Sequence, residues 1–279
     1  MALNQNHELF YYVRRLPAEL KRVVVIFISD LHYGNPNFSP THFKRTLDLI
    51  ASNPEYYMII NGDLCESAIK SSKGDVYSQV GTPQEQRDWV IKQLIPLKDR
   101  VLGATDGNHE RRITKEVGFD LTADIAAALT GSLGKCPYRP NGIALKIIFG
   151  SGNENHPEKP YTYHIYATHG YGGARTNSAK AVKVERLSYW IHSDCYAMSH
   201  DHTVNVSPTP YLIPDERSKV GEDGFETGPF REYRKILVKT NAYLKWGGYS
   251  EAGGFSPVDL LTPEVIFAGE GKRLVRVLI

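Results

Sequence analysis

The amino-acid sequence predicts an α/β fold, with a parallel sheet in the first half and a second sheet in the second half. Three apolar, β-branched segments alternate with two helical segments up to residue 105, which is typical of a parallel sheet with helical crossovers. After residue 140 strand candidates dominate. A β-rich half that follows an alternating half indicates two sheets packed together.

The elements of the first half follow from hydrophobic pattern and from helix-start signals. We expect strands at residues 23–29, 57–60 and 101–105, and helices at residues 41–51 and 82–94. The first strand is continuously apolar, which favours a strand that is buried on both faces. Thr41 after Pro40 and the pair Thr82-Pro83 are the residue types that begin helices.

The second half contains more strand candidates than helices. Helical character returns at residues 121–129 and 179–190. Strands are expected at 143–149, 161–168, 196–198, 236–240, 265–268 and 274–279. The sequence shows no internal repeat, so we expect residues 1–279 to form a single domain.

The composition excludes several classes of protein. With 41% hydrophobic and 23% charged residues, the chain is expected to be globular and not disordered. A net charge of +2 does not by itself indicate nucleic acid or a membrane as a partner. The three scattered cysteines imply neither a disulfide frame nor a zinc–thiolate site, and we expect a reducing, cytoplasmic location. No signal peptide and no membrane span are expected.

Potential metal ligands follow five of the expected strands. These residues are Asp30, His32, Asp63, Asn108, His169, His200 and His202. Any one of them alone would be read as an ordinary turn or core residue. Because the carboxyl ends of parallel strands meet at one sheet edge, their joint placement predicts a metal site there.

The pattern resembles that of the calcineurin-like metallophosphoesterases. The matching motifs are Asp30-Leu-His32, Gly62-Asp63, Gly107-Asn-His-Glu110, His169 and Ser199-His-Asp-His202, in the family's order. One departure is Ser199, which replaces the usual glycine and concerns backbone freedom rather than ligation. The resemblance implies a two-sheet β-sandwich flanked by helices, with a dinuclear metal site at the sheet edge.

The resemblance also implies a role for each ligand. Asp30, His32 and His202 would bind one ion, Asn108, His169 and His200 the other, and Asp63 would bridge them. Mixed imidazole and carboxylate ligands suit Mn first, with Fe or Zn as alternatives. Two ions about 3.5–4 Å apart can clamp an attacking hydroxide and a phosphate together. His109 is expected to be catalytic rather than a ligand, protonating the leaving oxygen.

Residues around this set are expected to have supporting roles. Glu110 is expected to begin a helix, and Asp201 is expected to point away from the metals. Arg111 and Arg112 are adjacent on that helix, so at most one faces the site. We assign Arg111, together with Asn108, to substrate binding.

The expected reaction is metal-dependent hydrolysis of phosphate esters, with phosphodiesters preferred over monoesters. The protein-phosphatase branch is set aside because Gly62-Asp63 is followed by Leu64-Cys-Glu-Ser67 and not by that branch's Asp-Arg-Gly. A nuclease acting on DNA or RNA is the first alternative. A non-catalytic metal-binding interaction module is the second, although such a module should lack ligands. No membrane partner is expected, and the oligomeric state is left open.

Overall fold

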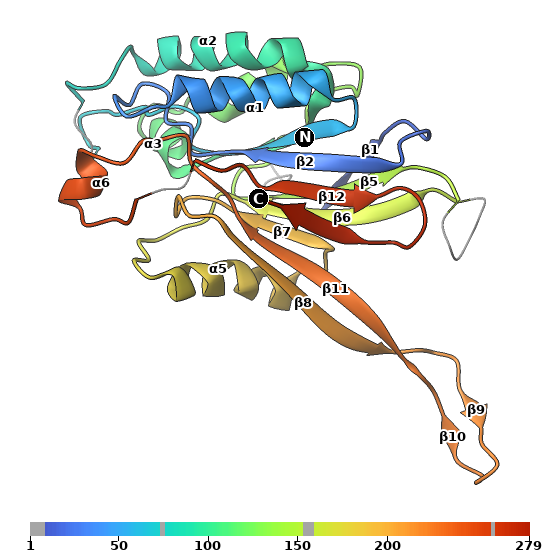
Figure 1. The fold of residues 1–279 in the computed structure, drawn as a ribbon. Coiled ribbons are helices and arrows are strands. Elements are labelled where there is room, and N and C mark those ends of the chain that lie inside the picture. The colour runs from blue at the N-terminus through green and yellow to red at the C-terminus, as the bar shows by residue number, and fades with distance from the viewer. Residues whose placement is uncertain (1–8, 73–75, 153–158, 258–259) are drawn as a thin grey trace.

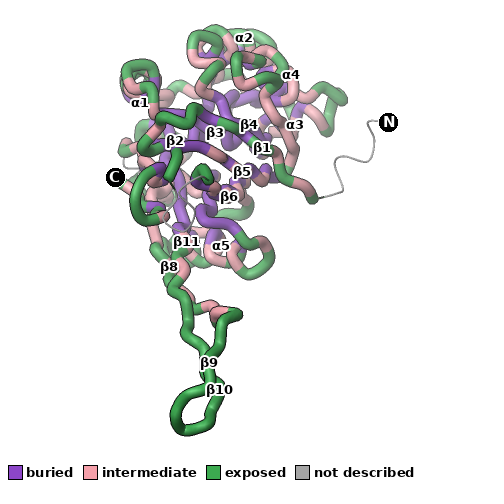
Figure 2. Tube along the Cα trace, turned by 90° about the vertical axis from the view of Figure 1, so that its right-hand side faces the viewer, coloured by how far each residue is buried: buried purple, intermediate pink, exposed green. Residues whose placement is uncertain are grey.

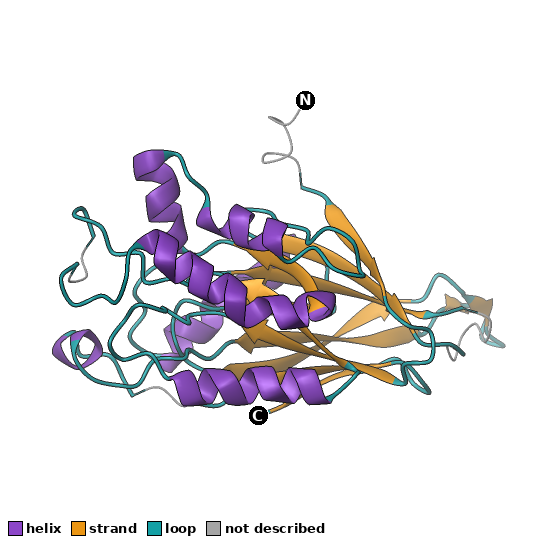
Figure 3. Cartoon of the chain, turned by 90° about the horizontal axis from the view of Figure 1, so that it is seen from above, coloured by secondary structure: helices purple, strands orange, loops and turns teal. Residues whose placement is uncertain are grey.

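The computed structural model describes residues 9–72, 76–152, 159–257 and 260–279. It consists of two β-sheets packed face to face, with helices on both outer faces (Figures 1 and 3). This arrangement confirms the predicted α/β fold class and the two-sheet sandwich flanked by helices.

The first sheet has five strands in the order β13-β12-β2-β3-β4. Its strands are β2 (Arg22–Ile28), β3 (Tyr56–Asn61), β4 (Val101–Thr105), β12 (Glu264–Ala268) and β13 (Val275–Leu278). Three of them, β2, β3 and β4, run parallel. In β2, Val23, Val25 and Phe27 face the other sheet, while the alternate residues pack under helices. Burial on both faces explains why this strand is continuously apolar.

Helices cover the outer face of this first sheet. They include α1 (Pro40–Ser52), α2 (Pro83–Leu94) and α4 (Leu121–Ala128), and α1 and α2 lie side by side above β2 in Figure 1. A 3-10 turn, η1 (Ile95–Arg100), links α2 to β4, and α3 (Asn108–Val117) follows β4. The strands and helices expected in the first half are therefore confirmed, with small shifts at their ends.

The second sheet has six strands in the order β1-β5-β6-β7-β11-β8. Its strands are β1 (Tyr11–Arg15), β5 (Ile143–Phe149), β6 (Tyr161–Thr168), β7 (Cys195–Met198), β8 (Asn205–Pro214) and β11 (Phe230–Lys239). Alternate residues of β5 and β6 are buried against the first sheet. On the outer face, α5 (Asn177–Trp190) packs Val184 and Leu187 against this sheet.

The structure departs from the sequence prediction mainly in an arm. Beyond the sheet, β8 and β11 continue as a projecting pair, and the tip carries β9 (Lys219–Val220) and β10 (Glu226–Thr227) (Figures 1 and 2). Neither β8 nor β1 was expected, and β11 begins at Phe230 rather than at residue 236. Because β8 lies at the sheet edge, it tolerates prolines that would disrupt a central strand.

The strands that precede the predicted ligands end together. Asn61, the last residue of β3, donates from Nδ2 to the carbonyl oxygen of Thr168 at the end of β6, at 2.9 Å. This bond joins the carboxyl ends of β3 in the first sheet and β6 in the second. A short helix, α6 (Tyr249–Ala252), lies near this edge in Figure 1. None of the helices in the described ranges is long and apolar enough to cross a membrane.

Candidate metal centre

The structure brings the predicted ligands together in two groups. Asp30, His32 and His202 form one group, and Asp63, His169 and His200 form the other, with the ligand atoms of each group within 4.8 Å of one another. Asn108 joins the second group, since its Oδ1 lies 3.2 Å from His169 Nε2. Apart from the placement of Asp63, these are the two sets that the family resemblance implies.

The carboxylate of Asp30 shows that a cation fits the first group. Its Oδ2 accepts hydrogen bonds from Ser29 Oγ at 2.7 Å and from the backbone N–H of His200 at 3.0 Å. Its Oδ1 is buried and accepts no hydrogen bond, although His202 Nε2 lies 3.0 Å away and His32 Nε2 lies 3.8 Å away. A buried carboxylate oxygen without a donor is costly, and a cation shared with these imidazoles would satisfy it.

Asp63 occupies the position that a bridging carboxylate requires. Its Oδ1 accepts the backbone N–H of His109 at 2.9 Å. Its Oδ2 lies 3.0 Å from His169 Nε2 in the second group and 3.7 Å from His32 Nε2 in the first. The same oxygen therefore faces both groups.

The histidines of the cluster are oriented through their outer nitrogens. His169 Nδ1 lies 2.8 Å from the carbonyl oxygen of Asn61, and His200 Nε2 lies 2.7 Å from that of Gly172. Because a carbonyl oxygen can only accept, each of these nitrogens carries the proton and the other presents its lone pair to the cluster. Both rings therefore have the tautomer that a metal ligand needs.

Glu66 supports the cluster, and the sequence analysis did not single it out. Its Oε2 lies 3.3 Å from His32 Nδ1, while His32 Nε2 faces the cluster. A carboxylate behind a ligand histidine raises the basicity of the ring and fixes its orientation. The only sequence signal for Glu66 is that it is an acidic residue three positions after Asp63. A glutamate in a loop is usually exposed to solvent, so the sequence alone does not identify it as a partner of His32.

His109 lies beside the cluster, and its role as a catalytic group stays a prediction. Its Nδ1 lies 2.6 Å from the backbone oxygen of Glu66, so the proton is on Nδ1 and Nε2 points inward. Nε2 is 4.0 Å from Asp63 Oδ2. His109 also lies within ligand distance of His32 and Glu66. His32, Glu66 and His109 thus form a third possible ligand group. Because His109 Nδ1 is engaged by the backbone oxygen of Glu66, we interpret this group as residues that hold His32 and His109 in place and not as a third metal site.

The backbone is strained at the cluster residues. Among the described residues, seven that are not glycine have a left-handed φ between 47° and 74°. Five of the seven are predicted ligands: Asp30, His32, Asp63, His200 and His202. Such conformations cost free energy and persist where the surrounding structure enforces them, which is common at functional sites.

Two glycines allow the loops after β3 and β4 to touch. A Cβ atom on Gly107 would overlap the side chain and the amide nitrogen of Asp63, and Gly62 has a φ of +82°. Glu110 lies in the first turn of α3, where an acidic residue was expected, and its carboxylate also binds these loops. It is fully buried, and its carboxylate accepts the backbone N–H groups of Asp63 and Cys65, each at 2.9 Å. Burial and then the charge of Asp63 raise the pKa of Glu110 to about 7.

Ser199 and Asp201 fix the loop that carries His200 and His202, through contacts on the side away from the cluster. Ser199 does not require a left-handed backbone, and its Oγ accepts hydrogen bonds from Asn61 Nδ2 at 2.5 Å and from Thr240 Oγ1 at 2.8 Å. Asp201 points away from the cluster, as expected, and forms ion pairs with Lys239 and Lys183.

The arginine assigned to substrate binding is already engaged. Arg111 donates to both carboxylate oxygens of Asp106, with distances of 3.1 Å from Nε and 2.6 Å from Nη2. This bidentate pair uses the edge of the guanidinium that would otherwise bind a phosphate. A role for Arg111 in substrate binding stays a prediction, and its contacts do not support it.

The cluster attracts positive charge. Burial lowers the pKa of His169, but Asp63 and Asp30 raise it more, to about 9. Burial raises the pKa of Glu66, but His32 lowers it more, to about 2. The carboxylates are thus ionised, and a divalent cation could replace the protons that the imidazoles otherwise hold.

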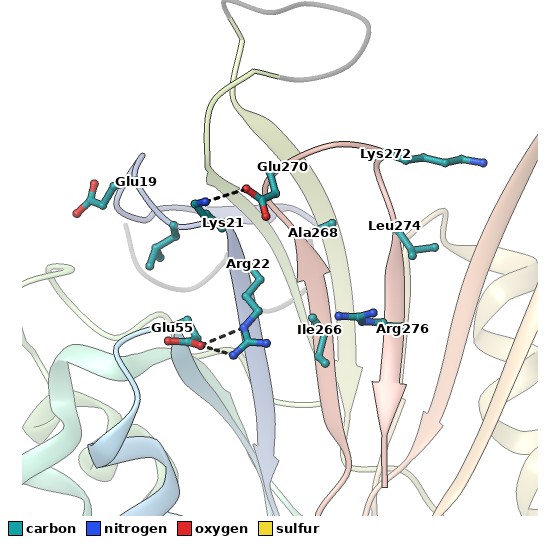
Figure 4. Close-up of a pocket in the computed structure, with 11 residues that line it drawn as sticks. Glu19, Lys21, Arg22, Glu55, Ile266, Ala268, Glu270, Lys272, Leu274 and Arg276 are labelled. Atoms are coloured by element: carbon teal, nitrogen blue, oxygen red, sulfur yellow. Dashed lines mark hydrogen bonds and ion pairs between the residues drawn. The ribbon is translucent and has the colours of Figure 1, made fainter.

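A hollow of about 710 Å³ lies at the opposite end of the first sheet (Figure 4). It is lined by Arg22 at the start of β2 and by residues of β12 and β13. Four of its charged side chains form two ion pairs, Arg22 with Glu55 and Lys21 with Glu270. Because no group of potential metal ligands lies among these residues, we place the functional site at the cluster.

Comparison with known proteins gives only structural likeness. No protein-family profile and no curated protein sequence matches the chain. A conserved protein of Streptococcus pneumoniae, described as a predicted phosphoesterase, is 10% identical over 93% of this chain and 98% of its own, with a TM-score of 0.36. The nuclease MPE of Pseudomonas putida is 13% identical over 91% of this chain and 87% of its own, with a TM-score of 0.35.

A third similar structure is zinc-bound Vps29 of Entamoeba histolytica. It is 11% identical over 92% of this chain and 98% of its own, with a TM-score of 0.32. Identities of 10–13% and TM-scores below 0.4 do not carry an argument about activity. The case for a function therefore rests on the residues of the cluster.

Proposed function

We propose that this chain is a metallophosphoesterase, a hydrolase that cleaves phosphate esters with two divalent metal ions. The observation that carries the proposal is the convergence of seven residues of ligand type at the ends of five strands. Asp30, His32 and His202 would hold one ion. Asn108, His169 and His200 would hold the other, with Asp63 Oδ2 shared between them.

The residues of the chain would divide the chemistry as follows. Bound divalent ions supply Lewis acidity, which neutralises phosphoryl oxygens and lowers the pKa of a water to about 7. Asn108 presents its amide oxygen to the cluster, where it can also help to orient the substrate. The backbone oxygen of Glu66 would accept a hydrogen bond from His109 Nδ1 and leave Nε2 directed at the cluster. Once Nε2 has also gained a proton, the imidazolium would donate that proton to the leaving oxygen.

We propose Mn as the first metal to test, with Fe and Zn as alternatives. A cluster that combines imidazoles with carboxylates suits these metals better than Mg or Ca, which favour sites made only of oxygens. The three cysteines are free, and Cys65 and Cys195 are buried. Free thiols support a reducing compartment, and we propose the cytoplasm.

A preference for phosphodiesters over monoesters belongs to the same proposal. A diester carries one negative charge, whereas a monoester dianion needs additional fixed cations near the metals. Arg111, adjacent to the motif, is engaged with Asp106, and Arg112 lies one helical turn beyond Asn108, away from the ester that is cleaved. The test compares bis(p-nitrophenyl) phosphate with p-nitrophenyl phosphate under saturating Mn. A higher kcat/KM for the monoester would reject the preference but not the reaction class.

Two alternatives are distinguished when DNA and RNA are added to the substrates of this assay. A nuclease would cleave DNA or RNA far better than the small diester. A non-catalytic metal-binding module would bind metal without hydrolysing any of these substrates. The inward Nε2 of His109 favours catalysis, because an imidazole that is not a ligand is unnecessary where only metal binding is required.

A further inference from the structure

The first turn of α3 places Arg112, rather than Arg111, beside the metal centre. An α-helix turns by about 100° per residue, so His109 lies about 100° around the axis from Asn108, and Arg112 lies about 40° from it. Arg112 therefore projects between the amide of Asn108 and the ring of His109, one turn farther along the helix. Arg111 lies about 300° from Asn108, on the side where it meets Asp106.

The contacts of Arg112 differ from those of its neighbour. Its side chain is half-buried, and Nη1 donates to Ser72 Oγ at 2.5 Å. Within the described ranges, no carboxylate lies at ion-pair distance from Arg112, whereas Asp106 Oδ1 lies 2.6 Å from Arg111 Nη2. A guanidinium that is partly withdrawn from water without an anion loses hydration and gains no ion pair in return. Among the described residues, the guanidinium therefore has donors available for an anion.

Arg112 lies beside the cluster and not inside it. It shares α3 with Asn108 and His109, whose side chains reach the cluster. Within the described ranges it forms no ion pair with Asp63 or Glu66, whose partners are histidines of the cluster.

We propose that Arg112 and Ser72 form a subsite for a second phosphate group of the substrate, next to the ester that is cleaved. This inference rests on the proposed function, in which the metals neutralise the cleaved group. Arg112 follows Asn108 by four residues, about 6 Å along the helix axis, which leaves room for a neighbouring phosphate. Its planar donors match two phosphate oxygens, and the Ser72 hydroxyl can supply a further hydrogen bond.

The substrate class is therefore a phosphodiester that carries another phosphate nearby. That second phosphate can be the next linkage of a nucleotide strand or a terminal phosphate, and the chemistry of the subsite is the same for both. The test uses the Mn-loaded protein with three thymidine substrates: the dinucleotide TpT, the trinucleotide TpTpT, and the dinucleotide phosphorylated at both ends. Preference for TpTpT identifies a strand, and preference for the doubly phosphorylated dinucleotide identifies a terminal phosphate.

Arg112→Ala should reduce kcat/KM by about 10–100-fold for whichever is preferred of TpTpT and the doubly phosphorylated dinucleotide. The loss should appear chiefly in KM, because a charge-assisted contact to the second phosphate is removed. Hydrolysis of TpT and of bis(p-nitrophenyl) phosphate should change by no more than about twofold, and Arg112→Lys should restore part of the loss. Lys92→Ala, which removes an equal charge at an exposed position of α2, should leave the preference unchanged.

Two results would overturn the subsite. One is an equal loss for every substrate in Arg112→Ala, which would place the guanidinium on the cleaved phosphate. The other is no loss for any substrate. Metal content and thermal unfolding of each variant exclude a failure to fold. If the wild-type protein hydrolyses nothing, the proposed function fails. Binding of thymidine 3′,5′-bisphosphate, compared with the two monophosphates in wild type and Arg112→Ala, then decides the subsite separately.

Discussion

Lys239 Nζ lies 2.6 Å from Asp201 Oδ2 in the interior of the protein, where 0% of one side chain and 2% of the other are exposed. Lys239 ends β11, and Asp201 stands between His200 and His202. Lys239 also donates to the carbonyl oxygen of Ser199 at 2.7 Å. A buried lysine is costly unless it is paired, so this pair indicates that the second sheet fastens the loop that carries two proposed ligands.

Lys239→Met should destabilise the metal-free protein by about 3 kcal/mol, near the lower end of the range for a broken buried pair. Asp201 would lose this partner but would keep Lys183 at 2.7 Å. The measurement is urea denaturation in the presence of a chelator. The double variant Lys239→Met with Asp201→Asn should recover part of the loss, because the buried carboxylate is removed together with its buried partner, although Lys183 then loses its ion pair. A single variant as stable as the wild type would contradict the role of the pair.

His109→Ala should lose about 10²–10⁴-fold in kcat and keep both metal ions, because a positioned acid contributes to chemistry and not to ligation. Activity on bis(p-nitrophenyl) phosphate and elemental analysis of the same sample give the two readouts. Asp63→Ala is the contrasting variant and should lose metal as well, since its Oδ2 faces both groups. Loss of metal from His109→Ala would mean that His109 is a ligand.

Gly107→Ala should lower activity by about 100-fold or more, because the loops after β3 and β4 would have to separate and misplace Asp63. The new Cβ would overlap both the side chain and the backbone nitrogen of Asp63, so a change of side-chain rotamer alone would not relieve the overlap. Gly173→Ala is the matched control. It lies in the loop after His169, where an added Cβ meets nothing within 4 Å. Similar losses in the two variants would argue against close loop contact as the cause.

His42 should make stability fall between pH 7 and pH 5. The side chain is buried on α1 beside Asn241, and burial, followed by the charge of Arg45, lowers its pKa to about 4. In the unfolded chain the imidazole of His42 takes up a proton near pH 6.5. The stability that neutral His42 contributes is therefore present above that pH and is lost as pH falls towards 4.

Between pH 7 and pH 5, the free energy of unfolding of the metal-free wild type should therefore fall by about 1–2 kcal/mol more than that of His42→Gln. This figure allows for partial hydration of the site. Urea denaturation at the two pH values measures the difference. The cluster histidines contribute equally to both proteins and cancel. An identical pH dependence in wild type and variant would show that folding does not lower the pKa of His42.

The sequence predicts most elements of the fold because their hydrophobic patterns are local. The strand at residues 101–105 and the strand at residues 161–168 match β4 and β6 at both ends. Prolines concealed β8, whose place at a sheet edge depends on tertiary structure. Similarly, Arg14 in β1 has the sequence signature of a surface residue. However, it is 5% exposed and donates from Nε to the carbonyl oxygen of Leu102 at 2.8 Å.

The sequence predicted which residues of ligand type converge, but it did not predict the residues that support them. The residues of ligand type follow the ends of successive strands in the order of the motifs, and this order can be read directly from the sequence. Glu66 and Lys239 act through distances to residues on other elements, and no local pattern encodes those distances. The choice between Arg111 and Arg112 likewise depended on Asp106 and Ser72. A single domain over residues 1–279 stays a prediction.

The central claim is that seven side chains hold two metal ions, and anomalous X-ray scattering at the Mn edge from crystals of the Mn-loaded protein tests it most directly. We expect two peaks per chain. One should lie between Asp30, His32 and His202, and the other between Asn108, His169 and His200, with Asp63 in contact with both. A map with no peak among these residues, or with peaks only elsewhere on the chain, would contradict the claim.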